Sequence, residues 1–189
     1  MKKNLGSLPA VYPMPVLMIG TYDENGKTDV MNAAWGQICD YDKIFISLSE
    51  DHKTCANFLK TKAFTVALAD ADHLAEADWF GTVSGNDTED KFERTGMHAE
   101  KSEFVNAPVI AEFPLTMECE LVRVLETDGI YGAIGRIVNV KAEESILNAE
   151  GKVDIGKTNF AMFDQFSNAY YGTGEKLANA WDIGVSRFG

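Results

Sequence analysis

Hydroxyl and basic side chains gather where a predicted strand ends and a predicted helix begins. In SLSEDHKTCANF, residues 47–58, Ser47 and Ser49 close the strand, and His52, Lys53 and Thr54 stand before or at the start of the helix. A helix N-terminus has unpaired amides and a partial positive charge, so these residues could cradle a phosphate. The alternative is an ordinary N-cap at Ser49 or Asp51. That alternative leaves the positive charges in the first turn opposing the helix dipole unless an anion offsets them.

A second group of polar side chains lies in TVSGNDTEDKFERTG, residues 82–96. Ser84 and Gly85 offer a hydroxyl and exposed backbone amides, and Lys91 is a basic residue among several acidic ones. By itself the segment is typical of a solvated loop followed by a salt-bridged helical face. The segment becomes a candidate site only in combination with the other two groups.

A third stretch, Asn32-Ala33-Ala34-Trp35-Gly36, places small residues beside one large aromatic. Small side chains allow a planar group or another backbone to come within contact distance, and Asn32 has donors and an acceptor for the edge of a heterocycle. The same pattern also fits a bulge or a tightly packed corner of a barrel wall. The residues leave both interpretations open.

The elements that must position these residues are mostly strands. A hairpin is predicted over 15–35 around the turn 23–26, with further strands at 43–49, 63–69, 115–125 and 130–142, the last two joined at Thr127-Asp128-Gly129. Helices are predicted over 51–62, over 70–81 with a capped start at Asp70 or Asp72, and over 88–95 with Gly96 closing it. This order predicts a mainly β fold with interposed helices, an antiparallel barrel or sandwich.

Composition limits the class of protein. With 189 residues, 46% of them hydrophobic, the chain can bury one core, so we expect a single domain over 1–189. The net charge of -12 disfavours nucleic acid and anionic membranes as partners. Cys39, Cys55 and Cys119 are unpaired by spacing, which favours a reducing compartment and a cytoplasmic location. His73 and His98 have no second ligand at metal spacing, so no metal site is expected.

The order and spacing of several segments resemble the flavin reductase-like family, and in particular its flavoredoxin-type branch. The segments that carry this resemblance cover most of the chain: PMPVLMIGTYDENGKTDVMNAAWGQI, ISLSEDHKTCANFLKTKAFTVAL, VSGNDTEDKFERTGM, NAPVIAEFPLTMECEL and YYGTG. The resemblance implies an FMN-binding split barrel and a homodimer with the flavin near the subunit interface. It therefore implies that some flavin contacts come from the partner subunit.

The resemblance also implies roles for particular residues. The isoalloxazine ring would lie against Asn32, Ala33, Ala34 and Trp35, and Ser47, Leu48 and Ser49 would line the ring and the ribityl chain. His52, Lys53 and Thr54 would hold the phosphate, and Ser84, Gly85 and Lys91 would complete that grip. Tyr170 and Tyr171 are adjacent in a predicted strand, so they point to opposite faces, and Tyr171 is expected at the flavin or the partner subunit.

One segment departs from the family pattern. Members that take hydride directly from a nicotinamide commonly carry a His in the late hairpin, whereas residues 128–134 read Asp-Gly-Ile-Tyr-Gly-Ala-Ile. We therefore expect an FMN-binding electron carrier whose donor is NAD(P)H or a redox protein. An NAD(P)H-dependent flavin reductase is the alternative. A flavin-free binding module on the same fold is disfavoured because both Lys53 and Lys91 are present. A flavin-binding module without redox function is a less favoured alternative.

Overall fold

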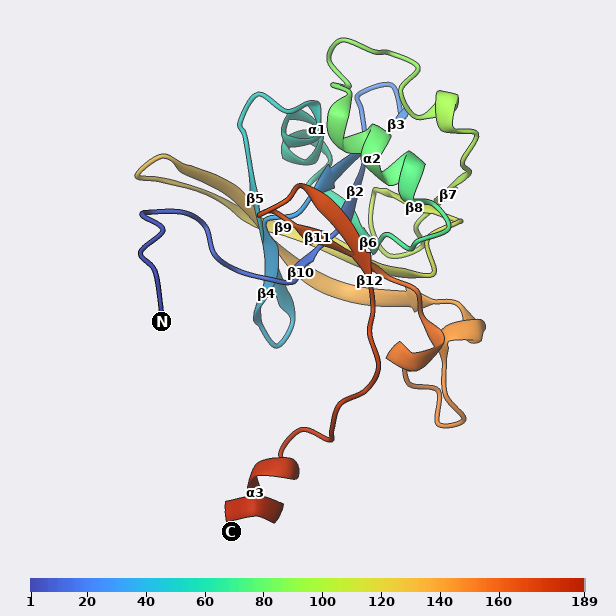
Figure 1. Ribbon diagram of the computed structural model, residues 1–189. Coiled ribbons are helices and arrows are strands. Elements are labelled where there is room, and N and C mark those ends of the chain that lie inside the picture. The colour runs from blue at the N-terminus through green and yellow to red at the C-terminus, as the bar shows by residue number, and fades with distance from the viewer. Residues whose placement is uncertain (189) are drawn as a thin grey trace.

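A seven-stranded antiparallel sheet forms the body of the protein in the computed structural model, which describes residues 1–188 (Figure 1). Its strands run in the spatial order β3-β2-β6-β9-β10-β5-β4. Their bounds are Thr28–Ala33 for β3, Leu17–Tyr22 for β2, Ala63–Leu68 for β6, Leu115–Thr127 for β9, Ile130–Ala142 for β10, Lys43–Leu48 for β5 and Gly36–Asp40 for β4.

The two edges of this sheet belong to strands that follow one another in the chain. β3 ends at Ala33 and β4 starts at Gly36, so the bend at Ala34 and Trp35 carries the chain from one edge to the other. The amide of Ser47 donates to the carbonyl of Trp35 at 2.7 Å, which ties the bend to β5. The sheet therefore curls around an apolar core that includes Phe58 and Phe64. The expected mainly β, antiparallel split barrel is confirmed.

Both predicted hairpins form. β2 and β3 pair from Leu17 with Ala33 to Tyr22 with Thr28. β9 and β10 are joined by Asp128 and Gly129, which both adopt positive φ, as a two-residue turn between twisted antiparallel strands requires. β4 was not predicted, because four of its five residues are exposed and give no apolar pattern.

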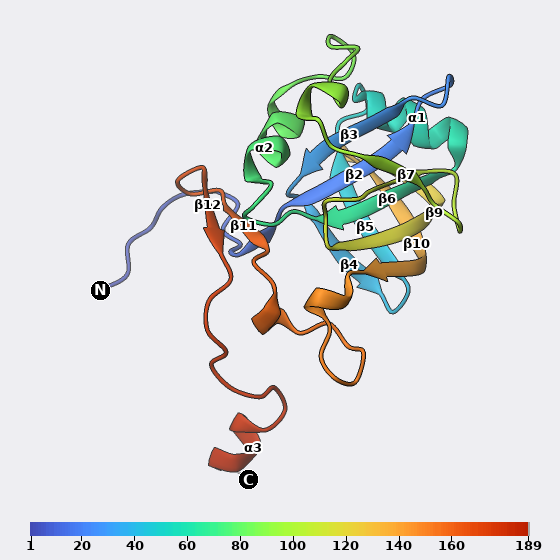
Figure 2. The same ribbon diagram turned by 90° about the vertical axis from the view of Figure 1, so that its right-hand side faces the viewer.

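Two helices cover the barrel near its β3 edge (Figure 2). α1 spans Lys53–Thr61 and buries Cys55 and Phe58, and it ends at Lys62 in the left-handed conformation. α2 spans Leu74–Thr82, packs on β3 and buries Ala77 and Phe80 in a second apolar cluster. The barrel therefore has one core inside the sheet and another beneath α2.

Two predictions about the helices are wrong in detail, and the alternative of an ordinary N-cap for α1 is not observed. α1 is capped by neither Ser49 nor Asp51: its N-cap is His52, without a side-chain capping bond. α2 starts at Leu74, because the Asp70 carboxylate accepts from the His73 amide at 3.0 Å and holds a turn before the helix. Residues 88–95 form turns and a single 3-10 turn, η1, at Glu93–Thr95, and the segment ends at Gly96 as expected.

The remaining elements are short. β1 (Met14–Pro15), β11 (Ala161–Asp164) and β12 (Ala169–Gly172) form a three-stranded sheet, and β7 (Ala99–Lys101) pairs with β8 (Pro108–Ile110). The 3-10 helices η2 and η3 cover Glu144–Ile146 and Ile155–Lys157, and α3 covers Ile183–Phe188. Among the residues described, no helix combines the length and the apolar character needed to cross a membrane.

Candidate functional site

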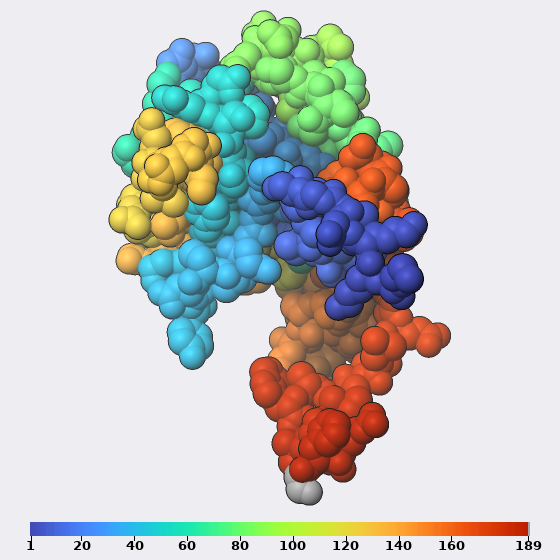
Figure 3. Space-filling model, turned by 60° about the vertical axis from the view of Figure 1, so that its left-hand side comes forward, coloured from blue at the N-terminus to red at the C-terminus, as the bar shows by residue number. Residues whose placement is uncertain are grey.

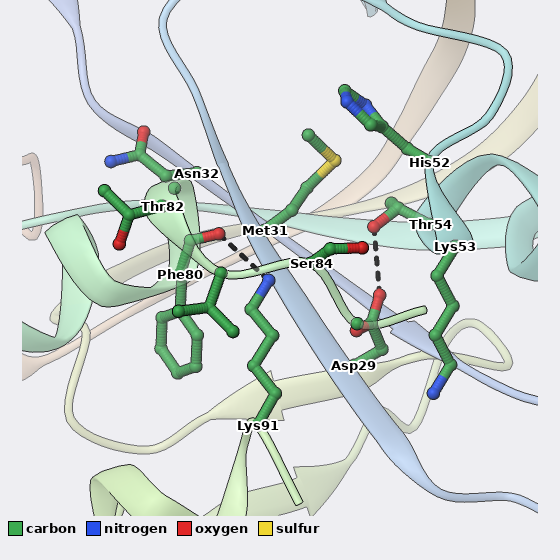
Figure 4. A pocket seen from close by; sticks show the side chains of 13 residues that line it. Asp29, Met31, Asn32, His52, Lys53, Thr54, Phe80, Thr82, Ser84 and Lys91 are labelled. Atoms are coloured by element: carbon green, nitrogen blue, oxygen red, sulfur yellow. Dashed lines mark hydrogen bonds between the residues drawn. The ribbon is translucent and has the colours of Figure 1, made fainter. Parts of the chain in front are cut away.

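A cavity of about 240 Å³ brings the three predicted segments together (Figure 4). It opens between β3, the N-terminus of α1 and the loop that follows α2. Seven of the predicted site residues line it: Asn32, His52, Lys53, Thr54, Ser84, Gly85 and Lys91. Asp29, Met31, Phe80, Gly81, Thr82 and Val83 complete the wall.

The start of α1 supplies the positive end of a helix to this cavity. Its first turn carries no acidic side chain, and its N-cap, His52, makes no side-chain capping bond. Within the part of the chain that the structure describes, the buried Nδ1 atom of His52 has no hydrogen-bond partner. Lys53 lies 3.9 Å from the Asp23 carboxylate, a long contact that leaves its ammonium free to approach an anion. These features favour a negatively charged ligand at this end.

Lys91 brings a buried positive charge to the opposite wall. The residue is 5% exposed, and its Nζ donates to the Phe80 carbonyl at 3.0 Å and lies 5.9 Å from the centre of the Phe80 ring. Burial lowers the pKa of the Lys91 ammonium, the Asp29 carboxylate raises it and Lys53 lowers it further. Among residues 1–188, no carboxylate forms an ion pair with Lys91 within 4 Å, so this buried ammonium would gain stability from an anion in the cavity.

Asp29 is the one charged residue of the cavity lining that the sequence analysis missed. It lies on β3, is 4% exposed, and accepts a hydrogen bond from the Thr54 hydroxyl at 3.0 Å. Figure 4 shows it between Lys53 and Lys91. An acidic residue at the second position of a strand that follows a hairpin turn normally indicates a solvated strand end, so its sequence context gave no sign of burial.

The loop after α2 is tied closely to Asp29 and to the start of α1. A Cβ at Gly85 would lie 2.4 Å from Asp29 Oδ1 and 3.1 Å from Lys53 Cδ, so only glycine fits there. The Asn86 side-chain Nδ2 donates to the Asp51 carbonyl at 2.9 Å, and the Asn86 backbone N–H donates to Ser84 Oγ at 3.1 Å. These contacts hold Ser84 and Gly85 in place before any ligand binds.

Asn32 closes the cavity on the side of α2. Its Nδ2 donates to the Ala77 carbonyl at 3.0 Å, and a Cβ at Gly81 would stand 3.1 Å from Asn32 Cβ. Nearby, the Tyr170 hydroxyl donates to Asp78 Oδ1 at 2.8 Å. Burial and this hydrogen bond raise the pKa of Tyr170 to about 12. β3, α2 and β12 are thus held in fixed positions around the cavity.

A second hollow is lined by Ala34, Trp35 and Gly36, the last three residues of the small-residue stretch 32–36. This uncharged groove has a volume of about 420 Å³ and lies between the N-terminal segment, the bend before β4, and β5 (Figure 3). Ala34, Trp35 and Ser47 line it together with Pro9, Val11, Pro13, Met14, Pro15, Gly36, Gln37, Phe45 and Gln165. None of these residues is charged, and Trp35 is 57% exposed.

Four predicted contacts lie in neither hollow. Ala33 faces the barrel core, and Leu48 packs against that core. Ser49 is exposed, and its carbonyl accepts from the His52 amide and from Cys55 Sγ. Tyr171 is exposed, on the face opposite the partly buried Tyr170, and meets the Tyr12 ring edge to face at 6.2 Å. Strand alternation turns Ala33 inward while its neighbours face the two hollows.

The residues present fit a flavin nucleotide. The cavity has a helix N-terminus, two lysines and an unpaired buried imidazole nitrogen for a phosphate. The part of the uncharged groove formed by Ala34, Trp35 and Ser47 has small and aromatic walls that suit a flat ring. No group of three or more His, Cys, Asp or Glu side chains that could hold a metal occurs among residues 1–188.

Comparisons with known proteins agree with this interpretation. The family model described as the flavin reductase like domain matches residues 9–157. The structure is similar to flavoredoxin of Desulfovibrio vulgaris (Miyazaki F), with a TM-score of 0.92 and 35% identity over 97% of this chain and 100% of that one.

Two further solved structures share the fold. Flavoredoxin from Methanosarcina acetivorans gives a TM-score of 0.86 with 26% identity, covering 99% of this chain and 98% of that one. The FMN-binding protein from Thermus thermophilus gives 0.76 with 19% identity, covering 95% and 99%. The family model covers most of the chain, and the fold agrees with it throughout. This chain therefore belongs to the flavin reductase-like family and is a flavin-binding redox protein of that type.

Proposed function

We propose that the protein binds one FMN and carries electrons on it, as a flavoredoxin-type carrier. The observation that carries this proposal is the convergence of the α1 N-terminus, Lys53 and the buried Lys91 on one preformed cavity. The likeness to two flavoredoxins over almost the whole chain, and to a protein named for FMN binding, supports the same conclusion.

In this proposal the residues of the cavity bind and orient the cofactor. His52, Lys53, Thr54, Ser84, Gly85 and Lys91 hold the phosphate through charge-assisted and backbone hydrogen bonds. Asn32 directs the polar edge of the ring, and Ala34, Trp35 and Ser47 form an apolar wall beside it. Bound FMN supplies the redox chemistry, and the protein positions it and tunes its potential.

The four predicted contacts outside both hollows have separate proposed roles. Ala33 and Leu48 pack at the barrel core and so hold β3 and β5 beside the proposed ring site. Ser49 holds the turn before α1 through its backbone carbonyl. Tyr171 is exposed beside the N-terminal segment, where a second subunit could meet it. We therefore propose a homodimer, with Tyr171 near the subunit interface.

The electron donor follows from the late hairpin. The turn between β9 and β10 is made by Asp128 and Gly129 without a His, so we propose that a redox protein, rather than NAD(P)H, supplies electrons directly. We also propose that residues 1–189 act as one domain and that the protein is located in the cytoplasm. Cys39, Cys55 and Cys119 are all free thiols, which suits a reducing compartment.

Calorimetric titration with FMN and with riboflavin tests the cofactor. We expect about one FMN per chain, and weaker binding of riboflavin because it lacks the phosphate that the lysines would contact. No FMN binding at tens of micromolar protein would refute the proposal. Equal affinity for the two ligands would refute the assignment of the cavity to the phosphate.

A further inference from the structure

The C-terminal arm, residues 174–188, is an apolar segment without a partner in the single chain. Figures 1 and 2 show it running away from the barrel and ending in α3. Its large apolar side chains are mostly exposed, with Leu177 98% and Trp181 96% exposed and Ile183, Val185 and Phe188 also open to solvent. Such a cluster on a water-exposed arm indicates an interaction surface.

The arm is attached to its own chain only at its root. Thr173 Oγ1 donates to the Thr158 carbonyl at 3.4 Å. Beyond that point, the hydrogen bonds found for residues 174–188 stay within the arm, such as that from the Ser186 amide to the Asp182 carbonyl at 2.8 Å. By contrast, the N-terminal segment is seated on the body, where the Gln165 side chain donates to the Pro9 carbonyl.

The uncharged groove is a matching surface on the barrel. It has apolar walls made by the N-terminal segment, Trp35 and Phe45, and none of its lining residues carries a charge. The whole chain has a net charge of -12, so most contacts between two copies would bring negative charges together. In the arm, Glu175 and Asp182 are balanced by Lys176 and Arg187, which gives it no net charge. An arm inserted in the groove avoids the repulsion.

The arm is large enough to contribute substantially to a dimer contact. A buried aromatic side chain contributes roughly 150–250 Å². Trp181 and Phe188 of one arm would therefore bury on the order of 300 Å² of their own surface. A symmetric pair of arms doubles that area, so the arms alone would supply a large part of the roughly 1,200 Å² at which specific stable interfaces begin.

We propose that the C-terminal arm of each copy packs into the uncharged groove of a second copy. The exchange is symmetric, as in most homodimers: the arm of one subunit meets the groove of the other, and the reverse. It rests on the proposed homodimer and adds to it the segment and the surface that hold the two subunits together. Since Ala34, Trp35 and Ser47 line the groove, the partner's arm would also complete the wall beside the proposed ring site.

Full-length variants test the contact from both sides. The arm variant carries Leu177→Asp and Trp181→Asp, and the groove variant carries Val11→Asp; all three positions are exposed in the single chain, so neither variant should unfold it. Sedimentation of each should show dimer affinity lowered by about a hundredfold or more, because each places charge in an apolar contact. Phe104→Asp is the control: Phe104 is also exposed, but it lies outside the groove and the arm, so this variant should remain dimeric.

Mixing the two defective variants tests directly whether an arm meets a groove. The arm variant retains an intact groove and the groove variant retains an intact arm, so a mixed pair can still form one arm-to-groove contact. With a tag on one variant, we expect its capture to retain the other variant, whereas neither should retain an untagged copy of itself. Absence of the mixed pair would overturn the proposal.

The same experiments distinguish this inference from the proposals on which it rests. A full chain that sediments as a monomer would refute both the homodimer and the arm exchange. Variants that dimerise as tightly as the unmodified chain would overturn only the arm exchange. The ratio of FMN to riboflavin affinity in the arm variant measures phosphate binding independently, since no residue of the arm lines the cavity proposed for the phosphate.

Discussion

At the scale of single residues, the candidate site depends on two lysines with different surroundings. Lys53 is partly exposed and lies near Asp23, whereas Lys91 is buried with its ammonium on a backbone carbonyl. The protein as a whole has a charge of -12, which repels a dianionic phosphate. Salt screens this repulsion beyond about 8 Å, the Debye length at physiological ionic strength, so it acts mainly at shorter distances. These local positive charges must therefore outweigh the repulsion at contact.

Removing either lysine should weaken FMN binding by about tenfold or more, because a charge-assisted hydrogen bond contributes roughly 1.5–3 kcal/mol. Calorimetry on Lys53→Ala and Lys91→Ala should show this loss for FMN and little change for riboflavin. Lys60→Ala is the matched control: Lys60 is also in α1, but it pairs with Glu24 at 2.7 Å outside the cavity. Equal losses for both ligands would show that the lysines support the fold instead.

The buried Lys91 also predicts a pH dependence. Burial lowers its pKa below the ordinary value of 10.5, so the folded chain releases this proton at lower pH than the unfolded chain does. A phosphate favours the ammonium form. FMN binding should therefore be strongest below the Lys91 pKa and weaken as pH rises through it. We expect the ratio of FMN to riboflavin affinity to fall between neutral pH and pH 10.5, and to fall less in Lys91→Met. An unchanged ratio would exclude Lys91 from the phosphate site.

At the scale of elements, the site depends on how closely the loop after α2 approaches β3 and α1. Gly85 lies against the Asp29 carboxylate, and Asn86 ties the loop to the residue before His52. Asp29 in turn accepts from Thr54 in the first turn of α1. One buried carboxylate therefore connects three elements, and a change in any of them should disturb the cavity.

Gly85→Ala tests this packing. Its Cβ would stand 2.4 Å from Asp29 Oδ1, so the loop must move away from β3. We expect a loss of about 1–3 kcal/mol in the free energy of unfolding, typical of overpacking, together with weaker FMN binding. Gly174→Ala is the control, since its added Cβ meets nothing within 4 Å. Denaturant melts and FMN titrations of both variants provide the comparison. Unchanged stability and affinity in Gly85→Ala would show that the loop is not held as described.

At the scale of the whole molecule, the split barrel exposes the two hollows and leaves the C-terminal arm free. The sheet curls until its edge strands β3 and β4 meet at Ala34 and Trp35, with the cavity on one side of this bend and the groove on the other. This arrangement suits a carrier that holds its cofactor firmly at the phosphate.

The carrier proposal predicts a specific pattern of reduction. Because the late hairpin lacks a His, oxidation of NADH or NADPH by the FMN-loaded protein should be much slower than ordinary enzyme turnover of about 10 per second. Reduction by dithionite should still be complete. Stopped-flow absorbance with each reductant measures both. Turnover at ordinary enzyme rates would favour the flavin reductase alternative over the carrier.

The sequence by itself determined six of the seven strands of the main sheet, both hairpin turns and seven of the residues that line the cavity. Alternating apolar residues and turn residues such as Asp128-Gly129 act over a few neighbours, so their effect can be predicted locally. His52, Lys53 and Thr54 were found for the same reason, since a helix start is a local feature.

Only the tertiary structure decided which residues, distant in the sequence, line the same cavity. Asp29 is buried because Gly85, far away in the sequence, leaves room beside it, and no local pattern encodes that contact. The division of the small-residue stretch also depends on the curl of the sheet: Asn32 faces the cavity, Ala33 the core, and Ala34 and Trp35 the groove. Strand pairing over long sequence distances sets that curl, so residue type and spacing along one segment cannot specify it.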